Sequence, residues 1–209
     1  MLFDFETLPV ADRYKLVVST VVPRPVAWVV SQDAEGVLNA APYSFFNALT
    51  DDPVVVAIGV GPRPGGAGKD TLSNIRATGQ FVVNLVSRAN LQAMNVTAID
   101  FPPEVDELAE AGLSTLPSHK VKPPRIAESP VALECETFQL IPVGHHTVVL
   151  GKVLAMHIAD DAMLDVEKRY VDTPKLDLVG RMHGRGWYML NDTRTEVPRI
   201  ALKDWKGRP

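Results

Sequence analysis

Short runs of β-branched residues, each ended by proline or glycine, constrain the fold of this chain more than any other feature. The clearest runs are 26–31 (VAWVVS), 53–60 (PVVVAIGV) and 147–159 (TVVLGKVLAMHIA). β-Branched side chains fit the pleated surface of a sheet, whereas proline and glycine interrupt strands and form turns. The chain carries 17 prolines and 14 glycines, so many turns separate these runs. The pattern predicts a β-rich domain with short connections.

The order of the predicted elements favours an antiparallel barrel over a doubly wound sheet. Strands are expected at 15–22, 26–31, 37–41, 53–60, 80–86, 131–141, 147–159 and 187–190, and short helices at 71–78, 88–97 and 104–111. Residues 42–52 show no periodicity and are interpreted as a functional loop or an irregular edge. Because strands follow strands instead of alternating with helices, the sequence predicts a small closed β-barrel. Composition does not change along the chain, so residues 1–209 are expected to form one domain.

Charge and cysteine content exclude several functional classes. The 209 residues include 21 basic and 25 acidic side chains, a formal charge of −4, which leaves no electrostatic footprint for nucleic acid. The single cysteine, Cys135, excludes an internal disulfide and a zinc site built from thiolates. The sequence shows no signal-peptide pattern and no run of ~18 apolar residues, so we expect a cytoplasmic protein without a membrane partner.

One segment combines the parts of a phosphate-binding site. A buried-strand pattern is followed by the glycine-rich stretch Gly61–Gly68 and then by Lys69, Asp70 and Thr71, which open a predicted helix with Asp70 or Thr71 as its N-cap. N–H groups in the first turn of a helix lack partners and carry partial positive charge, and Lys69 and Thr71 add an ammonium and a hydroxyl. Neither a Walker A loop nor a dinucleotide fingerprint fits the spacing. The alternative is a flexible hairpin leading to a capped helix.

A second segment, NAAPYSFFN at 39–47, has the composition of a surface that binds a planar ring. Its small residues permit close approach of a flat ligand, while Ser44 and Asn47 can hydrogen-bond a ring edge or a phosphate. The alternative is that Phe45 and Phe46 fill the core while Asn47 caps a turn. The residues alone leave both interpretations open.

Residue types that carry acid–base, nucleophilic or metal chemistry show no supporting pattern. The five histidines lack metal-ligand spacing and are interpreted as hairpin or surface residues, and Cys135 falls in an alternating strand where a small core residue is expected. The chain has no G-x-S-x-G nucleophile elbow, and the acids of 104–110 fit a solvated helix face. We therefore predict no catalytic side chain and no metal ligand.

Four blocks of the chain form a series that can be compared with known families. They are RPVAWVVS (24–31), NAAPYSFFNALTDDPVVVAIGV (39–60), KDTLSNIRATGQFVVNLVS (69–87) and PPRIAESPVALEC (123–135). Together they resemble the flavin reductase-like family, the FMN-binding split-barrel group that includes flavoredoxin and the reductase components of two-component monooxygenases. The ending VGRMHGRGWY (179–188) is also similar, but His183 stands where a glycine is expected, which leaves the role of Arg181–Trp187 open.

The resemblance implies a six-stranded antiparallel split β-barrel with a few short peripheral helices. It also implies a homodimer with FMN near the dimer interface, and FAD is the alternative flavin. The cofactor contacts implied are Arg24, Ser31, Asn39, Ala41, Pro42, Tyr43, Ser44, Phe45, Asn47, Lys69, Asp70 and Thr71. Within this set, Lys69, Asp70 and Thr71 should hold the phosphate, while Ala41–Ser44 should follow the ring and the ribityl chain.

The resemblance further implies an NAD(P)H-dependent flavin reductase that passes electrons to a flavin, a monooxygenase or another electron-transfer partner. Because a flavin carries the chemistry of hydride transfer, such a protein needs no acid–base side chain. Two alternatives remain open: a carrier that holds FMN tightly without oxidising NAD(P)H, and a non-catalytic split-barrel binding protein.

Overall fold

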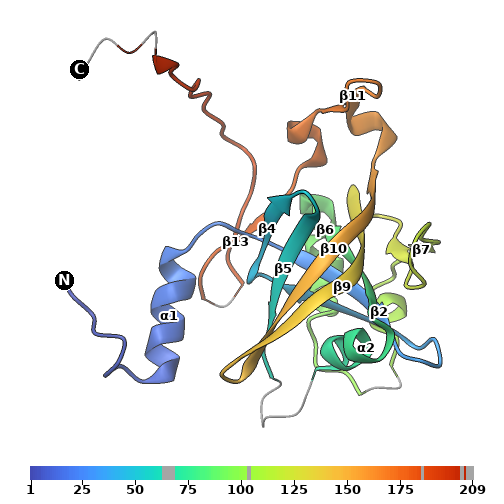
Figure 1. Cartoon of the computed structure of the whole chain (residues 1–209), viewed down its shortest axis with the longest axis horizontal. Helices are drawn as coiled ribbons and strands as arrows, with labels where there is room; N and C mark the ends of the chain where they lie inside the picture. The colour runs from blue at the N-terminus through green and yellow to red at the C-terminus, as the bar shows by residue number, and fades with distance from the viewer. Residues whose placement is uncertain (63–68, 103–104, 185, 203–204, 206–209) are drawn as a thin grey trace.

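A seven-stranded antiparallel sheet forms the centre of the computed structural model, which describes residues 1–62, 69–102, 105–184, 186–202 and 205 (Figure 1). The strand order is β3-β2-β6-β9-β10-β5-β4. The strands are β2 (Ala27–Gln32), β3 (Leu38–Tyr43), β4 (Phe46–Asp51), β5 (Val54–Val60), β6 (Gln80–Leu85), β9 (Val131–Val143) and β10 (His146–Ile158). The expected mainly β, antiparallel architecture is confirmed, with seven strands in the described sheet where six were expected.

The sheet closes on itself because its two edge strands are neighbours in sequence. β3 ends at Tyr43 and β4 begins at Phe46, so only Ser44 and Phe45 connect the two edges. Two residues span at most ~7 Å, so the sheet must curl until its edges meet. The Phe45 carbonyl also accepts a hydrogen bond from the Gly59 N–H at 2.7 Å, which holds this connection against β5. We call Ser44–Phe45 the seam of the barrel.

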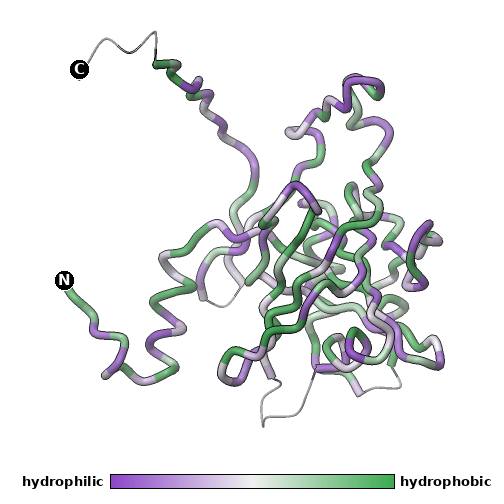
Figure 2. The backbone as a smooth tube through the Cα atoms, in the orientation of Figure 1, coloured by the Kyte–Doolittle hydropathy of each residue, from purple (hydrophilic) through white to green (hydrophobic). Residues whose placement is uncertain are grey.

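Strand β2 is buried on both faces, which explains its unbroken apolar sequence. Ala27 and Val29 lie in the barrel core, whereas Trp28 and Val30 belong to a second cluster outside the barrel. The second cluster includes residues of α3 (Leu91–Val96) and α4 (Glu107–Glu110). Successive side chains of a strand point to opposite faces, so both faces must be covered when the whole run is apolar. Figure 2 shows hydrophobic residues concentrated along the barrel strands.

The predicted helices form with small changes in their bounds. Helix α2 (Asp70–Thr78) ends as expected at Gly79, whose φ of +70° suits glycine. Its N-cap is Lys69, without a side-chain capping bond, so the expectation of an Asp70 or Thr71 cap was wrong. Residues 88–97 form the 3₁₀ turn η1 (Arg88–Asn90) followed by α3. Helix α4 is shorter than the predicted 104–111, and residues 103–104 lie outside the described part of the chain.

Of two expectations about the N-terminal part of the sheet, the first was wrong and the second was correct in one of its alternatives. Residues 15–22 were expected to form a strand, but α1 (Val10–Thr20) covers most of them. Helix propensities of β-branched residues differ from that of alanine by less than ~0.7 kcal/mol each, so tertiary contacts override them. Residues 42–52 were expected to form a functional loop or an irregular edge, and 46–51 form the edge strand β4, whose register on β5 shifts between Ala48 and Thr50. Pairing with β5 supplies the order that the sequence pattern lacks.

Short elements complete the structure around the barrel. They are β1 (Arg24–Pro25), β7 (Thr115–Leu116), β8 (Arg125–Ile126), η2 (Asp160–Ala162), β11 (Met163–Asp165), β12 (Tyr170–Val171), η3 (Thr173–Leu176), β13 (Gly180–Arg181) and β14 (Tyr188–Met189). The predicted hairpin of 131–141 with 147–159 is confirmed by β9 and β10, and β14 corresponds to the last predicted strand. Among the described residues, none of the helices is both long and apolar enough to span a bilayer.

Candidate functional site

Two hollows lie on either side of the seam. Each is lined by a different subset of the cofactor contacts predicted from the sequence. A polar cavity is lined by Asn39, Ala41, Pro42, Lys69, Asp70 and Thr71. An apolar groove is lined by Arg24, Ser44, Phe45 and Asn47. Pro42 and Ser44 are two residues apart, or roughly 7 Å along an extended chain. The chain from Ala41 to Ser44 therefore leads from the polar cavity into the groove. The Gly61–Gly68 stretch lies mostly outside the described residues.

The polar cavity contains the start of helix α2, held against β3. The Asn39 Nδ2 donates to the Thr71 Oγ1 at 2.9 Å, so the Thr71 hydroxyl keeps its own hydrogen available to an acceptor. The Thr71 side chain is buried, which fixes the position of this donor. Within the described part of the chain, the Thr71 backbone N–H forms no hydrogen bond. These two donors and the Lys69 ammonium are groups that could hydrogen-bond and neutralise an anion such as a phosphate.

Carboxylates also surround this cavity and oppose an anion there. Lys69 Nζ lies 3.8 Å from a carboxylate oxygen of Asp100, and Asp70 and Glu107 line the same space. Glu107 Oε2 accepts a hydrogen bond from the Ala40 N–H at 3.2 Å, which ties α4 to β3. Burial is the main cause that raises the pKa of Glu107, and the nearby Asp70 carboxylate adds to it. A raised pKa favours the neutral form of Glu107 and reduces its repulsion of an anion.

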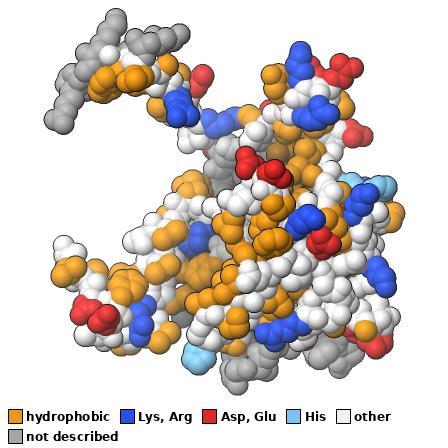
Figure 3. Space-filling view, viewed as in Figure 1, with side chains coloured by type: hydrophobic (Ala, Val, Ile, Leu, Met, Phe, Trp, Pro, Cys, Tyr) orange, Lys and Arg blue, Asp and Glu red, His pale blue; other side chains and the backbone are white. Residues whose placement is uncertain are grey.

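The apolar groove has a volume of about 590 Å³ and opens between α1 and the β4–β5 edge. Its lining is mostly hydrophobic, with Val17 and Val21 from the α1 side and Phe45, Val143 and Val148 from the barrel. Figure 3 shows hydrophobic side chains gathered in the space between the N-terminal helix and the barrel. Such a surface suits the apolar faces of a planar ring or a second protein chain.

Arg24 holds the elements around the groove in place. Its Nη1 donates to the carbonyls of Val18 (2.9 Å) and Val21 (2.7 Å), and its Nη2 donates to the Met182 carbonyl at 2.8 Å. Its Nε lies 3.4 Å from the Ser44 Oγ. Burial is the main cause that lowers the pKa of the Arg24 guanidinium, which stays charged. Arg24 thus links the end of α1 to the seam and to residue 182.

Ser31 and Tyr43 lie in the interior and line neither hollow. Ser31 is fully buried, and its Oγ accepts a hydrogen bond from the Asn74 Nδ2 at 3.3 Å. Tyr43 is buried in the barrel core at the end of β3. Ten of the predicted contacts therefore line the two hollows, whereas Ser31 and Tyr43 are buried in the interior.

The sequence reasoning missed His146, which lines the groove at the first position of β10. A Cβ added at Gly61 would lie only 2.7 Å from the His146 Nε2, so the ring packs directly on the Gly61 backbone. The pairing of Thr147 with Val60 brings the hairpin to this position. The sequence could not predict that His146 lines the groove. The position of a histidine at a hairpin depends on the register of β10 on β5, which is set by long-range pairing.

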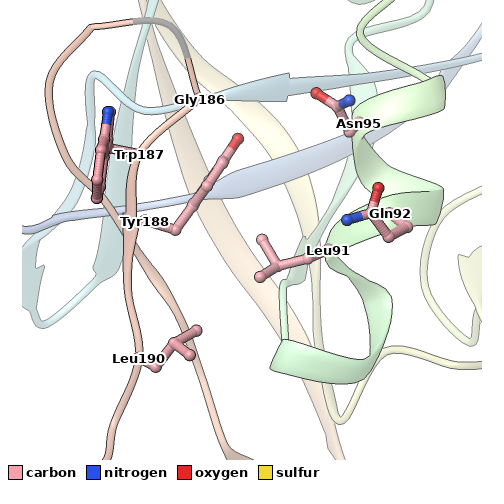
Figure 4. Close-up of a pocket in the computed structure, with 7 residues that line it drawn as sticks. All are labelled: Leu91, Gln92, Asn95, Gly186, Trp187, Tyr188 and Leu190. Atoms are coloured by element: carbon pink, nitrogen blue, oxygen red, sulfur yellow. The ribbon is translucent and has the colours of Figure 1, made fainter.

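A further hollow of about 500 Å³ separates α3 from residues 186–190 (Figure 4). Tyr188, Leu91 and Gln92 line it, and the Arg181 guanidinium lies 4.8 Å from the centre of the Tyr188 ring. His183 and Trp187 stack with ring centres 6.3 Å apart. None of the predicted cofactor contacts lines this hollow, so the role of Arg181–Trp187 stays open. Residue 185 lies outside the described part.

Side chains for other chemistry are not assembled in the described residues. Cys135 is fully buried in the core, and burial raises the pKa of its thiol, so the reactive thiolate is disfavoured. No group of histidine, cysteine and acidic side chains among the described residues could hold a metal ion. Among the described residues, a polar cavity at the start of α2 and an apolar groove lie on either side of the barrel seam.

Comparison with known proteins identifies the family of this chain. The sequence profile of the "Flavin reductase like domain" matches residues 18–174. A Deinococcus radiodurans protein of unassigned function is 44% identical over 208 residues, covering 98% of this chain and 92% of the relative. The chain belongs to the flavin reductase-like family, and the family resemblance seen in the sequence blocks is confirmed.

Two solved structures support the same fold. Nitrilotriacetate monooxygenase component B from Bacillus cereus is 30% identical, with a TM-score of 0.88 over 94% of this chain and 98% of that protein. Pseudomonas fluorescens 2-nitrobenzoate 2-nitroreductase NbaA is 31% identical, with a TM-score of 0.89 over 99% and 100%. The protein is therefore a split-barrel, flavin-related oxidoreductase.

Proposed function

We propose that this protein binds FMN and transfers a hydride to it from NADH or NADPH. The observation that carries the proposal is the course of Ala41–Ser44, which connects the anion-accepting start of α2 to the apolar groove. A flavin nucleotide has the matching shape, with a phosphate at one end and a planar ring at the other. FMN, when bound, supplies hydride acceptance and the ability to pass electrons on singly or in pairs.

The phosphate end is assigned to the polar cavity. Lys69 would neutralise charge, while the Thr71 hydroxyl and backbone N–H would donate hydrogen bonds. Asn39 holds the Thr71 side chain at 2.9 Å and so positions the hydroxyl for this role. Asp70 forms the first residue of α2 and would orient the turn rather than contact the anion.

The ring end is assigned to the seam. Ala41 and Pro42 present little side-chain bulk, so a flat ring can approach the backbone of β3. Ser44 and Asn47 offer polar groups to the ring edge, and Phe45 shields that edge from water. The rest of the groove would receive the nicotinamide, and His146 would form one polar point of its wall.

The acceptor and the assembly follow from the related structures and from the exposed groove. One neighbour is named as a monooxygenase component and the other as a nitroreductase, so a partner monooxygenase and a nitroaromatic compound are the two acceptors to test. The groove leaves apolar residues such as Val143 exposed, and a second copy of the chain would cover them. We therefore include a homodimer in the proposal.

Rapid mixing of the FMN-loaded protein with NADH or NADPH tests the proposed reaction. The flavin absorbance should bleach without a partner protein or a chemical reductant, because the groove admits the nicotinamide directly. Bleaching only by dithionite or by a second protein would instead identify an electron carrier. Absence of a flavin spectrum after incubation with FMN would identify a non-catalytic binding protein and overturn the proposal.

The Lys69→Ala variant tests the orientation of the flavin. Loss of the ammonium should weaken FMN binding by about tenfold or more, because a charge-assisted contact to phosphate is lost. Riboflavin lacks the phosphate, so its affinity should change by less than about twofold. Fluorescence titration measures both affinities, and Lys152→Ala provides a control at a half-buried lysine outside the cavity. Equal weakening of FMN and riboflavin would contradict the phosphate assignment.

A further inference from the structure

A fourth hollow, polar and away from the seam, lies between β8 and the last residues of β10. It has a volume of about 420 Å³, and its lining includes Arg125, Ser129, Met156, His157, Ile158 and Asp160. It shares no lining residue with the polar cavity or the apolar groove. Several of its lining residues lie at the end of β10 that leads to β11, and Figure 1 shows this end opposite the β9–β10 turn. The proposed flavin site does not use these residues.

Among the described residues, Arg125 lines this hollow and carries one unpartnered donor, its Nε. This nitrogen is buried and has no hydrogen-bond partner in the described part of the chain. A buried donor without a partner is unfavourable, so an acceptor that reaches the guanidinium would stabilise the fold. Arginine stays charged and presents its donors in a planar fork that matches the two oxygens of a carboxylate.

His157 forms a fixed polar wall beside Arg125. Its Nε2 lies 2.5 Å from Glu134 Oε1, and the Glu134 side chain has no solvent exposure. Glu134 also accepts hydrogen bonds from the backbone N–H groups of His119 (2.7 Å) and Lys120. The His157 ring is 29% exposed, so it is held from behind while part of it faces solvent. Such bracing is typical of a preorganised binding wall.

The remaining groups that line the hollow determine which kind of anion it would prefer. The Ser129 hydroxyl lies 2.8 Å from the carbonyls of both Leu85 and Val131, so its hydrogen is already used within the protein. Asp160 is exposed at the rim and repels additional negative charge. Met156 and Ile158 add apolar surface. One guanidinium, one opposing carboxylate and apolar walls favour an organic monoanion over a phosphate dianion.

We propose that this hollow binds a small organic carboxylate, with the two carboxylate oxygens on Arg125 and the carbon frame against Met156 and Ile158. The site is separate from the proposed flavin site, so its occupancy does not depend on that assignment. It is a binding site for a ligand or effector, and no chemical step is assigned to it.

Calorimetric titration of the full-length, FMN-saturated protein with benzoate at low ionic strength tests the proposal. Benzoate should bind saturably to the wild type. Arg125→Gln should weaken binding about tenfold or more, because the paired N–H donors are lost. Arg125→Lys should also lose most of the affinity, because lysine keeps the charge but lacks the fork. Arg194→Gln, which makes the same charge change on the C-terminal segment, should leave the affinity within about twofold.

Five outcomes would overturn the proposal. They are the absence of saturable binding to the wild type, equal weakening by Arg194→Gln, full affinity in Arg125→Lys, a preference for inorganic phosphate over benzoate, and competition between benzoate and FMN. Repeating the titration without FMN separates the sites: an unchanged benzoate affinity supports the separate hollow, whereas competition with FMN would place benzoate at the flavin site and overturn it. Arg125→Lys keeps the test decisive if Arg125→Gln fails to fold, which circular dichroism would show.

Discussion

Two buried carboxylates show how immediate neighbours decide the protonation of a side chain. Burial by itself would raise the pKa of Glu134, but hydrogen bonds from His119, Lys120 and His157 lower it below its ordinary value. Glu107 receives fewer such bonds and lies near Asp70, so burial prevails and raises its pKa. Glu134 therefore favours the ionised form as a structural anchor, while Glu107 is driven towards the neutral form beside the polar cavity.

The Glu134→Gln variant tests the anchor. A lowered pKa in the folded state stabilises the fold above the unfolded-state value near 4.5, and this contribution is lost as pH falls through the folded-state pKa. The variant should lose about 2–3 kcal/mol of unfolding free energy at neutral pH, because hydrogen bonds to a charged acceptor are weakened. The difference from wild type should shrink as the pH is lowered below 4.5.

Urea denaturation between neutral and acidic pH measures this difference. Glu136→Gln is the matched control, since Glu136 lies two residues along β9 and forms a half-buried pair with Lys152. That change should cost less than about 1 kcal/mol. A pH-independent loss in Glu134→Gln would contradict the assigned ionisation.

Among the secondary-structure elements, β9 and β10 form a long hairpin that bends across the barrel. The register of the pair shifts between Leu150 and Gly151 and again between Val153 and Ala155. Such irregularities bend a strand and help a sheet to close. Gly151 also lies directly over the ring of Phe81 from β6, where a Cβ would be 2.4 Å from the Phe81 Cζ. The curvature of β10 thus depends on a glycine that lets an aromatic ring fill the core.

Gly151→Ala should destabilise the protein by about 1–3 kcal/mol, because the added methyl group overpacks a core in which Phe81 is fully buried. Thermal unfolding measures the loss. The double variant with Phe81→Leu provides the control, since a shorter side chain makes room for the methyl group. The cost of Gly151→Ala should be smaller in that background, and equal costs in both backgrounds would exclude the contact with Phe81 as its cause.

At the scale of the whole molecule, the barrel closes at the seam, and the two hollows assigned to the proposed function lie next to it. The edge strands β3 and β4 meet there, the polar cavity lies on one side, and the apolar groove lies on the other. The groove is rimmed by exposed hydrophobic residues, among them Val21 and Val143. Exposed apolar surface of this kind is typical of an interface.

Sedimentation equilibrium tests the proposed homodimer. The wild type should sediment at twice the chain mass of 22.8 kDa. Val143→Asp places a charge in the groove and should raise the dimer dissociation constant by about tenfold or more. Leu164→Asp, on an exposed residue of β11, should have little effect and serves as the control. A monomeric wild type, or equal effects of the two substitutions, would contradict an interface at the groove.

Much of the local structure could be predicted from the sequence because short-range patterns specify it. The apolar run 26–31, the stop of α2 at Gly79 and the hairpin around Gly144 follow from side-chain periodicity and turn chemistry. The predicted contacts Lys69 and Thr71 lie at a helix start, as expected, because residues adjacent in sequence stay adjacent in space. The family blocks extended this prediction to the seam residues.

Long-range contacts decided what the sequence could not determine. Residues 15–22 have strand-like composition, yet α1 forms there and Arg24 binds its terminal carbonyls. His146 faces the groove only because β10 pairs with β5 in one register. The sequence alone determined most of the barrel strands, the turns and the helix start at Lys69–Thr71. Only the tertiary structure made the sequence neighbours β3 and β4 the two opposite edges of one sheet, because the strands between them pair across long sequence separations.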